Sequence, residues 1–147
     1  MQRVEHMIGP KDFKTLTAEQ FMESAVSYYR VDDAAEKLAE AITEGGFGSV
    51  PILAQDGTVV GIVSEFDLLN AIKEGKDLSK VTAGDIMTKG AISVKKDTPA
   101  TEIIDLLQSK HLIRVAVVDA EGRLLGIVAR KDILLGYIRA TKRMWSF

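Results

Sequence analysis

Apolar residues recur with helical spacing in two stretches of the chain. The first set is Ala35, Leu38, Ala39 and Ile42, and the second is Ala100, Ile103, Ile104 and Leu107. Both sets follow the i, i+3, i+4, i+7 pattern, which places the side chains on one face of a helix. The pattern therefore predicts two amphipathic helices.

Each predicted helix is followed by apolar runs that are typical of strands. These runs are "SVPIL" (49–53) and "TVVGIVS" (58–64) in the first stretch, and "RVAVV" (114–118) and "RLLGIVA" (123–129) in the second. The intervening "QDG" and "AEG" contain residue types that are common in hairpin turns. A second helix then opens at Asp67 and again at Asp132. The predicted order is short strand, helix, strand, hairpin, strand, helix, given twice, which is an α/β fold.

The two stretches are copies of one pattern at a fixed offset of 65 residues. The offset relates Gly61 to Gly126, Asp67 to Asp132, and "TAEQFM" (17–22) to "TAGDIM" (82–87). A solenoid needs at least three repeats, so a repeat that occurs twice predicts a pair of units whose apolar faces close on each other. We divide the chain into residues 1–75, with an N-terminal segment and the first unit, and residues 76–147, with the second unit and a C-terminal tail.

The composition argues against several classes of protein. The chain has 147 residues and a formal net charge of −2, so no strong positive field attracts nucleic acid or an anionic membrane. Its apolar runs are too short to span a bilayer, and its first residues lack the apolar stretch of a secretory signal. It has no cysteine and two histidines, so it offers neither a thiol nucleophile nor a cluster of zinc ligands. We predict a cytosolic protein that is not an enzyme and has no catalytic cofactor or metal.

The segments "SVPILAQDGTVVGIVSEFDLLNAI" and "IRVAVVDAEGRLLGIVARKDILLGYI" resemble the cystathionine β-synthase (CBS) domain, whose tandem pair is called a Bateman module. The resemblance covers about residues 16–138. Five features recur at one spacing: the T-A-x-x-x-M start, the helix, the apolar strand, the hairpin and the G-I-V-x-x-x-D ending. The resemblance implies two β-α-β-β-α units packed sheet to sheet about a pseudo-two-fold axis, with an N-terminal helix that crosses to the second half.

The repeated aspartates, Asp67 and Asp132, have two compatible roles. An aspartate at a helix start accepts backbone N–H bonds and interacts favourably with the helix dipole. Its carboxylate also has the acceptors that the two hydroxyl groups of a ribose require, and helix N-termini favour phosphate. The family resemblance implies the second role, because CBS pairs commonly bind adenosine compounds in the cleft between the halves with this aspartate on the ribose.

The residues around the two aspartates differ. Ser64 precedes Asp67 by three residues, where the family often has a hydroxyl that donates to phosphate, but the matching residue before Asp132 is Ala129. The second repeat instead has Arg130 and Lys131, whose charges suit phosphate. The alternative is that these two cations form a solvated helix start with nothing bound.

The resemblance also implies which residues form the opposite wall of each ligand site. For a ligand held by Asp67, these are Ala91, Ile92, Val94, Arg114 and Ala116. For a ligand held by Asp132, they are Ser27, Tyr28, Tyr29, Val50 and Pro51. In the first set, the aliphatic residues suit adenine and Arg114 suits phosphate. In the second set, the two tyrosines either stack on a base or fill the space.

These observations favour a stand-alone regulatory module that binds an adenosine-containing ligand and signals to an effector protein. AMP, ADP, ATP, NADH and S-adenosylmethionine all fit this description. We also expect a homodimer, as CBS pairs associate through their helices, and the apolar residues of the C-terminal tail suit an interface. The alternative is a structural dimerisation module with a degenerate cleft, in which the aspartates only cap helices.

Overall fold

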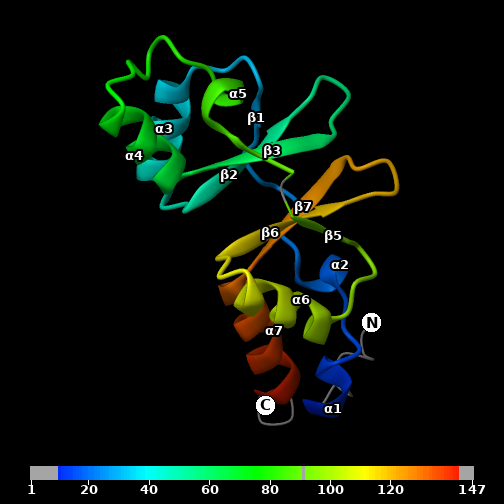
Figure 1. Cartoon of the computed structure of the whole chain (residues 1–147). Helices are drawn as coiled ribbons and strands as arrows, with labels where there is room; N and C mark the ends of the chain where they lie inside the picture. The colour runs from blue at the N-terminus through cyan, green and yellow to red at the C-terminus, as the bar shows by residue number, and fades with distance from the viewer. Residues whose placement is uncertain (1–9, 91, 143–147) are drawn as a thin grey trace. The chain divides into compact units, whose positions relative to one another are not determined.

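The structure is a computed structural model that describes residues 10–90 and 92–142 (Figure 1). The described residues form two compact units, which we name after the repeated aspartate in each. The Asp67 unit comprises residues 25–93 and 118–124, and the Asp132 unit comprises the described residues within 1–24, 94–117 and 125–147. The division that we predict at residue 75 follows the sequence repeats rather than these units, and it stays a prediction.

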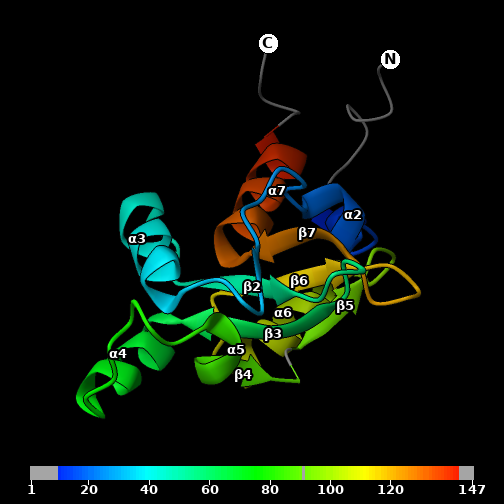
Figure 2. The same cartoon turned by 90° about the horizontal axis from the view of Figure 1, so that it is seen from above.

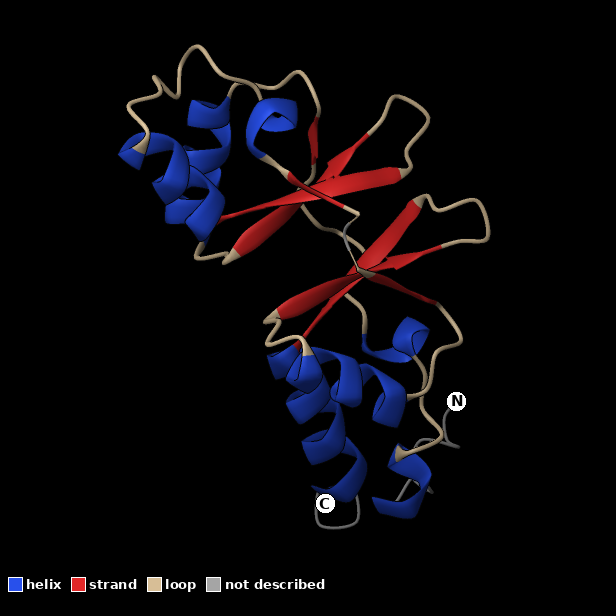
Figure 3. Ribbon diagram, in the orientation of Figure 1, coloured by secondary structure: helices blue, strands red, loops and turns tan. Residues whose placement is uncertain are grey.

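The Asp67 unit contains a four-stranded sheet in the order β1-β2-β3-β4 (Figure 3). Its strands are β1 (Tyr29–Arg30), β2 (Ser49–Leu53), β3 (Val59–Ser64) and β4 (Thr88–Lys89). Strand β1 is parallel to β2, whereas the other neighbours are antiparallel. The helices are α3 (Ala35–Gly45), α4 (Glu65–Lys73) and α5 (Ala83–Ile86). The predicted apolar face of α3 is buried at Leu38 and Ile42, which pack with Val50, Ile52 and Val63 of the sheet.

The Asp132 unit is built around the sheet β5-β6-β7. Its strands are β5 (Ser93–Lys95), β6 (Arg114–Val118) and β7 (Leu124–Ala129), and its helices are α1 (Pro10–Phe13), α2 (Ala18–Phe21), α6 (Ala100–Ser109) and α7 (Arg130–Lys142). The apolar face of α6 is buried at Ile103 and Leu107. The ring of Phe13 lies edge-on to that of Tyr137, with centroids 5.2 Å apart, and so joins α1 to α7. The N-terminal helices therefore pack with elements of the second repeat, as the resemblance implies.

The segment at the start of each repeat pairs with the sheet of the other repeat. Thr88 in β4 pairs with Ile62 in β3, and these strands lie side by side (Figure 2). At the equivalent place in the Asp132 unit, Glu23 forms an antiparallel bridge with Ile127. The short helices follow the same rule, because the backbone N–H of Ala83 in α5 donates to the carbonyl of Asp33 at 2.8 Å. The equivalent residues are Ala18, 65 positions before Ala83, and Thr98, 65 positions after Asp33, and they form the matching bond at 2.9 Å.

This exchange explains the glycine of the repeated G-I-V motif. A Cβ atom on Gly61 would lie 2.9 Å from the carbonyl oxygen of Thr88, and one on Gly126 would lie 2.8 Å from that of Glu23. Both distances are shorter than real Cβ contacts. Only glycine therefore allows the segment from the other repeat to approach the strand this closely. The predicted order of strand, helix, strand, hairpin, strand and helix is confirmed in both repeats.

Candidate functional site

Asp67 lies in the first turn of α4, where it forms a capping box with Ser64. Its Oδ2 atom accepts the backbone N–H of Ser64 at 2.8 Å and the Ser64 hydroxyl at 3.1 Å. The backbone N–H of Asp67 in turn donates to Ser64 Oγ at 3.2 Å. The capping role that the sequence predicts for Asp67 is therefore present, and its carboxylate is fixed by neighbours in its own repeat.

The structure adds one partner that the sequence does not indicate. The hydroxyl of Thr88 donates to Oδ1 of Asp67 at 3.1 Å. Thr88 reaches Asp67 because β4 pairs with β3, which runs directly into α4. The sequence gives one indirect sign that this position matters. The residue 65 positions before Thr88 is Glu23, so the two repeats differ here. That difference marks the position as one where the repeats diverge, but it does not reveal the contact.

Asp132 occupies the matching position in the first turn of α7. Its Oδ2 atom accepts the backbone N–H of Ala129 at 2.8 Å, as Asp67 does from Ser64. Ala129 has no hydroxyl, so the second bond of the capping box does not form. Asp132 lines an open hollow of about 490 Å³, whose other lining residues are Glu23, Lys131, Leu134, Leu135 and Ile138. The structure thus brings the predicted residues Asp132 and Lys131 to one hollow.

Arg114 at the start of β6 belongs to the electrostatic environment of Asp132. Burial lowers the pKa of the Arg114 guanidinium, whereas the charges of Asp132 and Glu23 raise it. We predict from the family resemblance that Arg114 serves a ligand held by Asp67, and that role stays a prediction. No sequence pattern indicates that Arg114 lies close enough to Asp132 for the two charges to interact. An anion at Asp132 would therefore meet a compensating positive charge from the same unit.

The two basic residues that follow Ala129 line different hollows. The Nε atom of Arg130 donates to the carbonyl of Leu112 at 2.7 Å, and the Arg130 backbone N–H donates to Ile113 at 2.9 Å. Its side chain lines a mainly apolar hollow of about 260 Å³ together with Ile104, Leu107, Gln108, Ile133 and Leu134. Arg130 thus anchors the segment between α6 and β6. A role for Arg130 on phosphate stays a prediction.

The remaining predicted residues differ in exposure. Tyr28 is 47% exposed, and the Arg30 guanidinium lies 5.6 Å from its ring centroid. Tyr29 is partly buried against the core of the Asp67 unit. Ser27 and Ile92 are exposed, Pro51 is buried in β2, and Ala116 is buried in β6. Ala91 lies outside the described residues. Of the two tyrosines, Tyr28 presents a ring surface to solvent.

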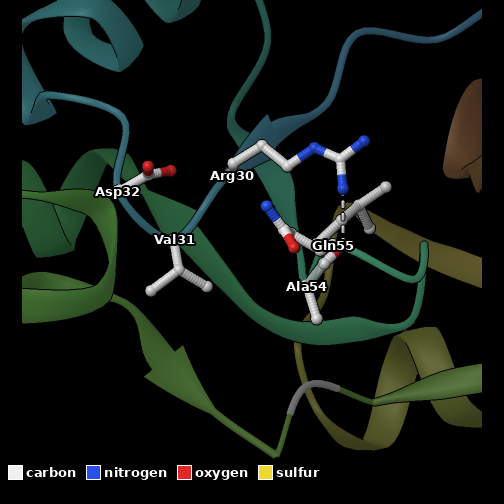
Figure 4. A pocket seen from close by; sticks show the side chains of 6 residues that line it. Arg30, Val31, Asp32, Ala54 and Gln55 are labelled. Atoms are coloured by element: carbon white, nitrogen blue, oxygen red, sulfur yellow. Dashed lines mark hydrogen bonds between the residues drawn. The ribbon is translucent and has the colours of Figure 1, made fainter.

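The Asp67 unit also has an open hollow of about 580 Å³ at the ends of β1 and β2 (Figure 4). Its lining residues are Arg30, Val31, Asp32, Leu53, Ala54 and Gln55. Arg30 Nη1 donates to the Ala54 carbonyl at 2.6 Å, which fixes the guanidinium at one side of the hollow. None of the predicted ligand residues lines this hollow, so it is distinct from the surroundings of the aspartates.

No group of three or more His, Cys, Asp or Glu side chains within 10–90 and 92–142 is arranged to hold a metal ion. In the same part of the chain, no helix has the length and apolar character needed to cross a membrane.

The repeats, their β-α-β-β-α order and the aspartate at each final helix agree with one protein family. Residues 18–74 and 83–138 each match the model of the CBS domain. The chain therefore belongs to the CBS domain family and carries two such domains.

Comparison with curated proteins identifies relatives that are longer than the matched region. An uncharacterized protein of Methanopyrus kandleri is 36% identical over 103 residues, which are 69% of this chain and 53% of that protein. Arabinose 5-phosphate isomerase KdsD of Escherichia coli is 31% identical over 93 residues, which are 63% of this chain and 28% of the enzyme. The chain thus spans about half or less of these relatives.

The fold matches solved CBS structures over most of the chain. CBSX2, a CBS-pair protein of Arabidopsis thaliana, was solved in complex with AMP and gives a TM-score of 0.74 at 26% identity. The match covers 84% of this chain and 97% of that one. The α/β fold with two sheets that the sequence predicts is therefore confirmed.

Proposed function

We propose that the chain is a regulatory CBS pair that binds an adenosine-containing ligand through Asp67 and Asp132. The observation that carries the proposal is the repeated placement of a carboxylate in the first turn of a helix. In both units the backbone N–H three residues earlier holds Oδ2 at 2.8 Å. The similarity to CBSX2, which was solved in complex with AMP, supports an adenine nucleotide as the ligand class.

The chemistry of these sites suits a ribose next to a phosphate. An ionised carboxylate is an acceptor only, so it can receive both hydroxyl protons of a vicinal diol. Lys131 shares a hollow with Asp132, and Arg114 lies within electrostatic reach of that carboxylate. A phosphate bound beside Asp132 would meet these cations. We therefore expect AMP, ADP or ATP to bind more tightly than uncharged adenosine.

Regulation requires that the ligand favour one of two arrangements of the protein, either alone or with a partner. We propose that the exposed apolar sides of α4 and α7 provide the contact surface of a homodimer and of an effector protein. Leu69 on α4 is 60% exposed, and its counterpart Leu134 on α7 is 64% exposed. Ile72 and its counterpart Tyr137 are 55% and 45% exposed. Side chains of this kind are better placed at an interface than in water.

Binding and capping can be separated with a matched control. Asp85 caps α5 by bonds of the same type, accepting the Thr82 N–H at 2.9 Å and donating its own N–H to Thr82 Oγ1 at 3.3 Å. We expect Asp67→Ala and Asp132→Ala each to weaken nucleotide binding at its own site about tenfold or more, because each removes charged hydrogen bonds to the ribose. Asp85→Ala should lower stability and leave the affinity unchanged.

The assay is calorimetric titration of AMP, ADP, ATP, NADH and S-adenosylmethionine, with melting curves as a second readout. A ligand at about 100 times its dissociation constant stabilises the folded state by roughly 2.7 kcal/mol, which a melting curve resolves. If Asp67→Ala and Asp132→Ala behave like Asp85→Ala with every ligand, ribose binding by these carboxylates is wrong.

One observation favours a second candidate, a structural module whose aspartates only cap helices. Both oxygens of Asp67 already accept hydrogen bonds within the chain, from Ser64 and Thr88. Under this alternative, none of the five ligands raises the melting temperature. Asp67→Ala would then show the stability loss of a missing cap and nothing else.

A further inference from the structure

The carboxylate of Asp67 is largely occupied by the chain itself. A carboxylate has about four acceptor positions, two on each oxygen. In the described residues, Oδ2 of Asp67 accepts the N–H and the hydroxyl of Ser64, at 2.8 Å and 3.1 Å. Oδ1 accepts the Thr88 hydroxyl at 3.1 Å. A ribose diol that donates two hydrogen bonds therefore finds too few free acceptors on Asp67.

The carboxylate of Asp132 is more open. Within the described part of the chain it accepts one hydrogen bond, from the N–H of Ala129 at 2.8 Å. The equivalent of the Ser64 hydroxyl is missing because Ala129 has a methyl group. The equivalent of Thr88 is Glu23, which pairs with Ile127 as Thr88 pairs with Ile62. An ionised glutamate cannot donate a hydrogen bond, so Asp132 keeps acceptors for both hydroxyl groups of a diol.

We propose that the Thr88 hydroxyl competes with ribose for Asp67, so that an adenosine ligand binds at Asp132 before it binds at Asp67. This inference rests on the proposed function, and it makes Thr88 a determinant of site preference. Thr88 is exposed, and its backbone stays paired with β3 when its side chain turns. The hydroxyl can therefore leave Asp67 by rotation about χ1 without a change in the sheet. Ligand concentration then decides whether one or both aspartates are occupied.

The test uses the full chain with the Asp132 site disabled by Asp132→Ala. In this background, Thr88→Val removes the competing hydroxyl while keeping the β-branched shape. We expect it to tighten AMP binding about tenfold, which is the net value of a hydroxyl bond to a charged acceptor. Thr88→Ser retains the hydroxyl and should bind AMP as the Asp132→Ala protein does. Calorimetric titration measures all three proteins, and circular dichroism checks that each is folded.

A second ligand and a second mutant background test whether the effect of Thr88→Val on affinity depends on the ribose diol and on Asp67. AMP that lacks the 2′ and 3′ hydroxyl groups has no diol, so Thr88→Val should leave its affinity unchanged. In an Asp67→Ala background, Thr88→Val should also leave the affinity for AMP unchanged, because the carboxylate to which the Thr88 hydroxyl donates is absent. A gain with AMP that appears in the Asp132→Ala background alone supports the inference.

Three results would overturn the inference, and they can be told apart. If Thr88→Val binds AMP as weakly as the Asp132→Ala protein does, Thr88 does not compete, and the proposed function stands. If neither the parent chain nor any variant binds AMP, ADP or ATP, the proposed function fails and the inference fails with it. Weaker AMP binding after Thr88→Val would also overturn it, because Thr88 would then assist the ligand.

Discussion

Ser64 offers a quantitative test of how much the hydroxyl of the capping box contributes to stability. Ser64→Ala removes the bond from the Asp67 N–H to Ser64 Oγ, of 3.2 Å, and the bond from Ser64 Oγ to Asp67 Oδ2, of 3.1 Å. It leaves the bond from the Ser64 N–H to Asp67 Oδ2, of 2.8 Å, in place. Ala129 and Asp132 show that a helix starts in this way without the hydroxyl. The variant should therefore fold.

The expected cost of Ser64→Ala is about 1 kcal/mol, within the usual range of roughly 0.5–2 kcal/mol for the loss of an N-cap hydroxyl. For a chain of this length, that corresponds to a fall in melting temperature of roughly 2–4 °C. The reverse change, Ala129→Ser, adds the missing hydroxyl beside Asp132. Because residue 129 is 5% exposed, the added oxygen must bond to Asp132 or lose its hydration without compensation.

Urea unfolding at neutral pH measures both variants, and the slope of the free energy against urea shows whether the two units unfold together. A loss below about 0.3 kcal/mol for Ser64→Ala would refute the assignment of a stabilising cap, because it falls under the whole range for such residues. A strong stabilisation by Ala129→Ser would show that α7 has an unfilled cap position. A loss would show that the buried hydroxyl remains unsatisfied.

Three further predictions test the fold and the surfaces. Gly126→Ala should cost about 1–3 kcal/mol of unfolding free energy, since its Cβ would lie 2.8 Å from the Glu23 carbonyl, and unchanged stability in urea would contradict the close approach. Backbone hydrogen bonds, first of all from Arg123, lower the pKa of the Asp119 carboxyl in the folded protein below its usual 3.8. The ionised carboxylate therefore stabilises the fold above pH 3.8, and this contribution is lost as the pH falls through the pKa of the folded state. Asp119→Asn should therefore be less stable at neutral pH and lose less stability on acidification than the parent, which parallel acid titrations would show. Leu69→Ser and Leu134→Ser should shift a dimer toward monomer in light scattering, whereas a parent of monomer mass would argue against the proposed interface.

The order of elements is predictable because each signal is local. The helical spacing of Leu38 and Ile42 and the continuous apolar run of β2 depend on neighbours within a few residues. The exchange of segments between repeats is not local, because Thr88 pairs with Ile62 across 26 residues of chain. Periodicity says which side chains are apolar, but it does not say which strand supplies the partner.

The site is partly predictable for the same reason. The repeat identifies Asp67 and Asp132, and their positions at helix starts follow from the strand that ends before each. The Thr88 contact and the grouping of Arg114 with Asp132 depend on which elements share a unit. Arg130 shows the limit most clearly. Its charge suggests phosphate, yet its Nε atom donates to the Leu112 carbonyl, which no sequence pattern indicates.

The two repeats agree in the bonds that build the fold and differ in the bonds that surround the carboxylates. Both keep the hydrogen bond from a backbone N–H to the aspartate. Both also keep the β-pairing between the start of one repeat and the sheet of the other. The differences are Ser64 against Ala129, and Thr88 against Glu23, and each removes a hydroxyl donor from the neighbourhood of Asp132. A carboxylate that only caps a helix gains nothing from losing those donors, because the capping N–H bond is present in both repeats. Among the described residues, Asp132 therefore keeps unfilled acceptors near Arg114 and Lys131, and these would serve the hydroxyl and phosphate groups of the proposed ligand. This asymmetry is easier to explain by ligand binding than by capping, and it favours Asp132 as the site that an adenosine ligand fills first.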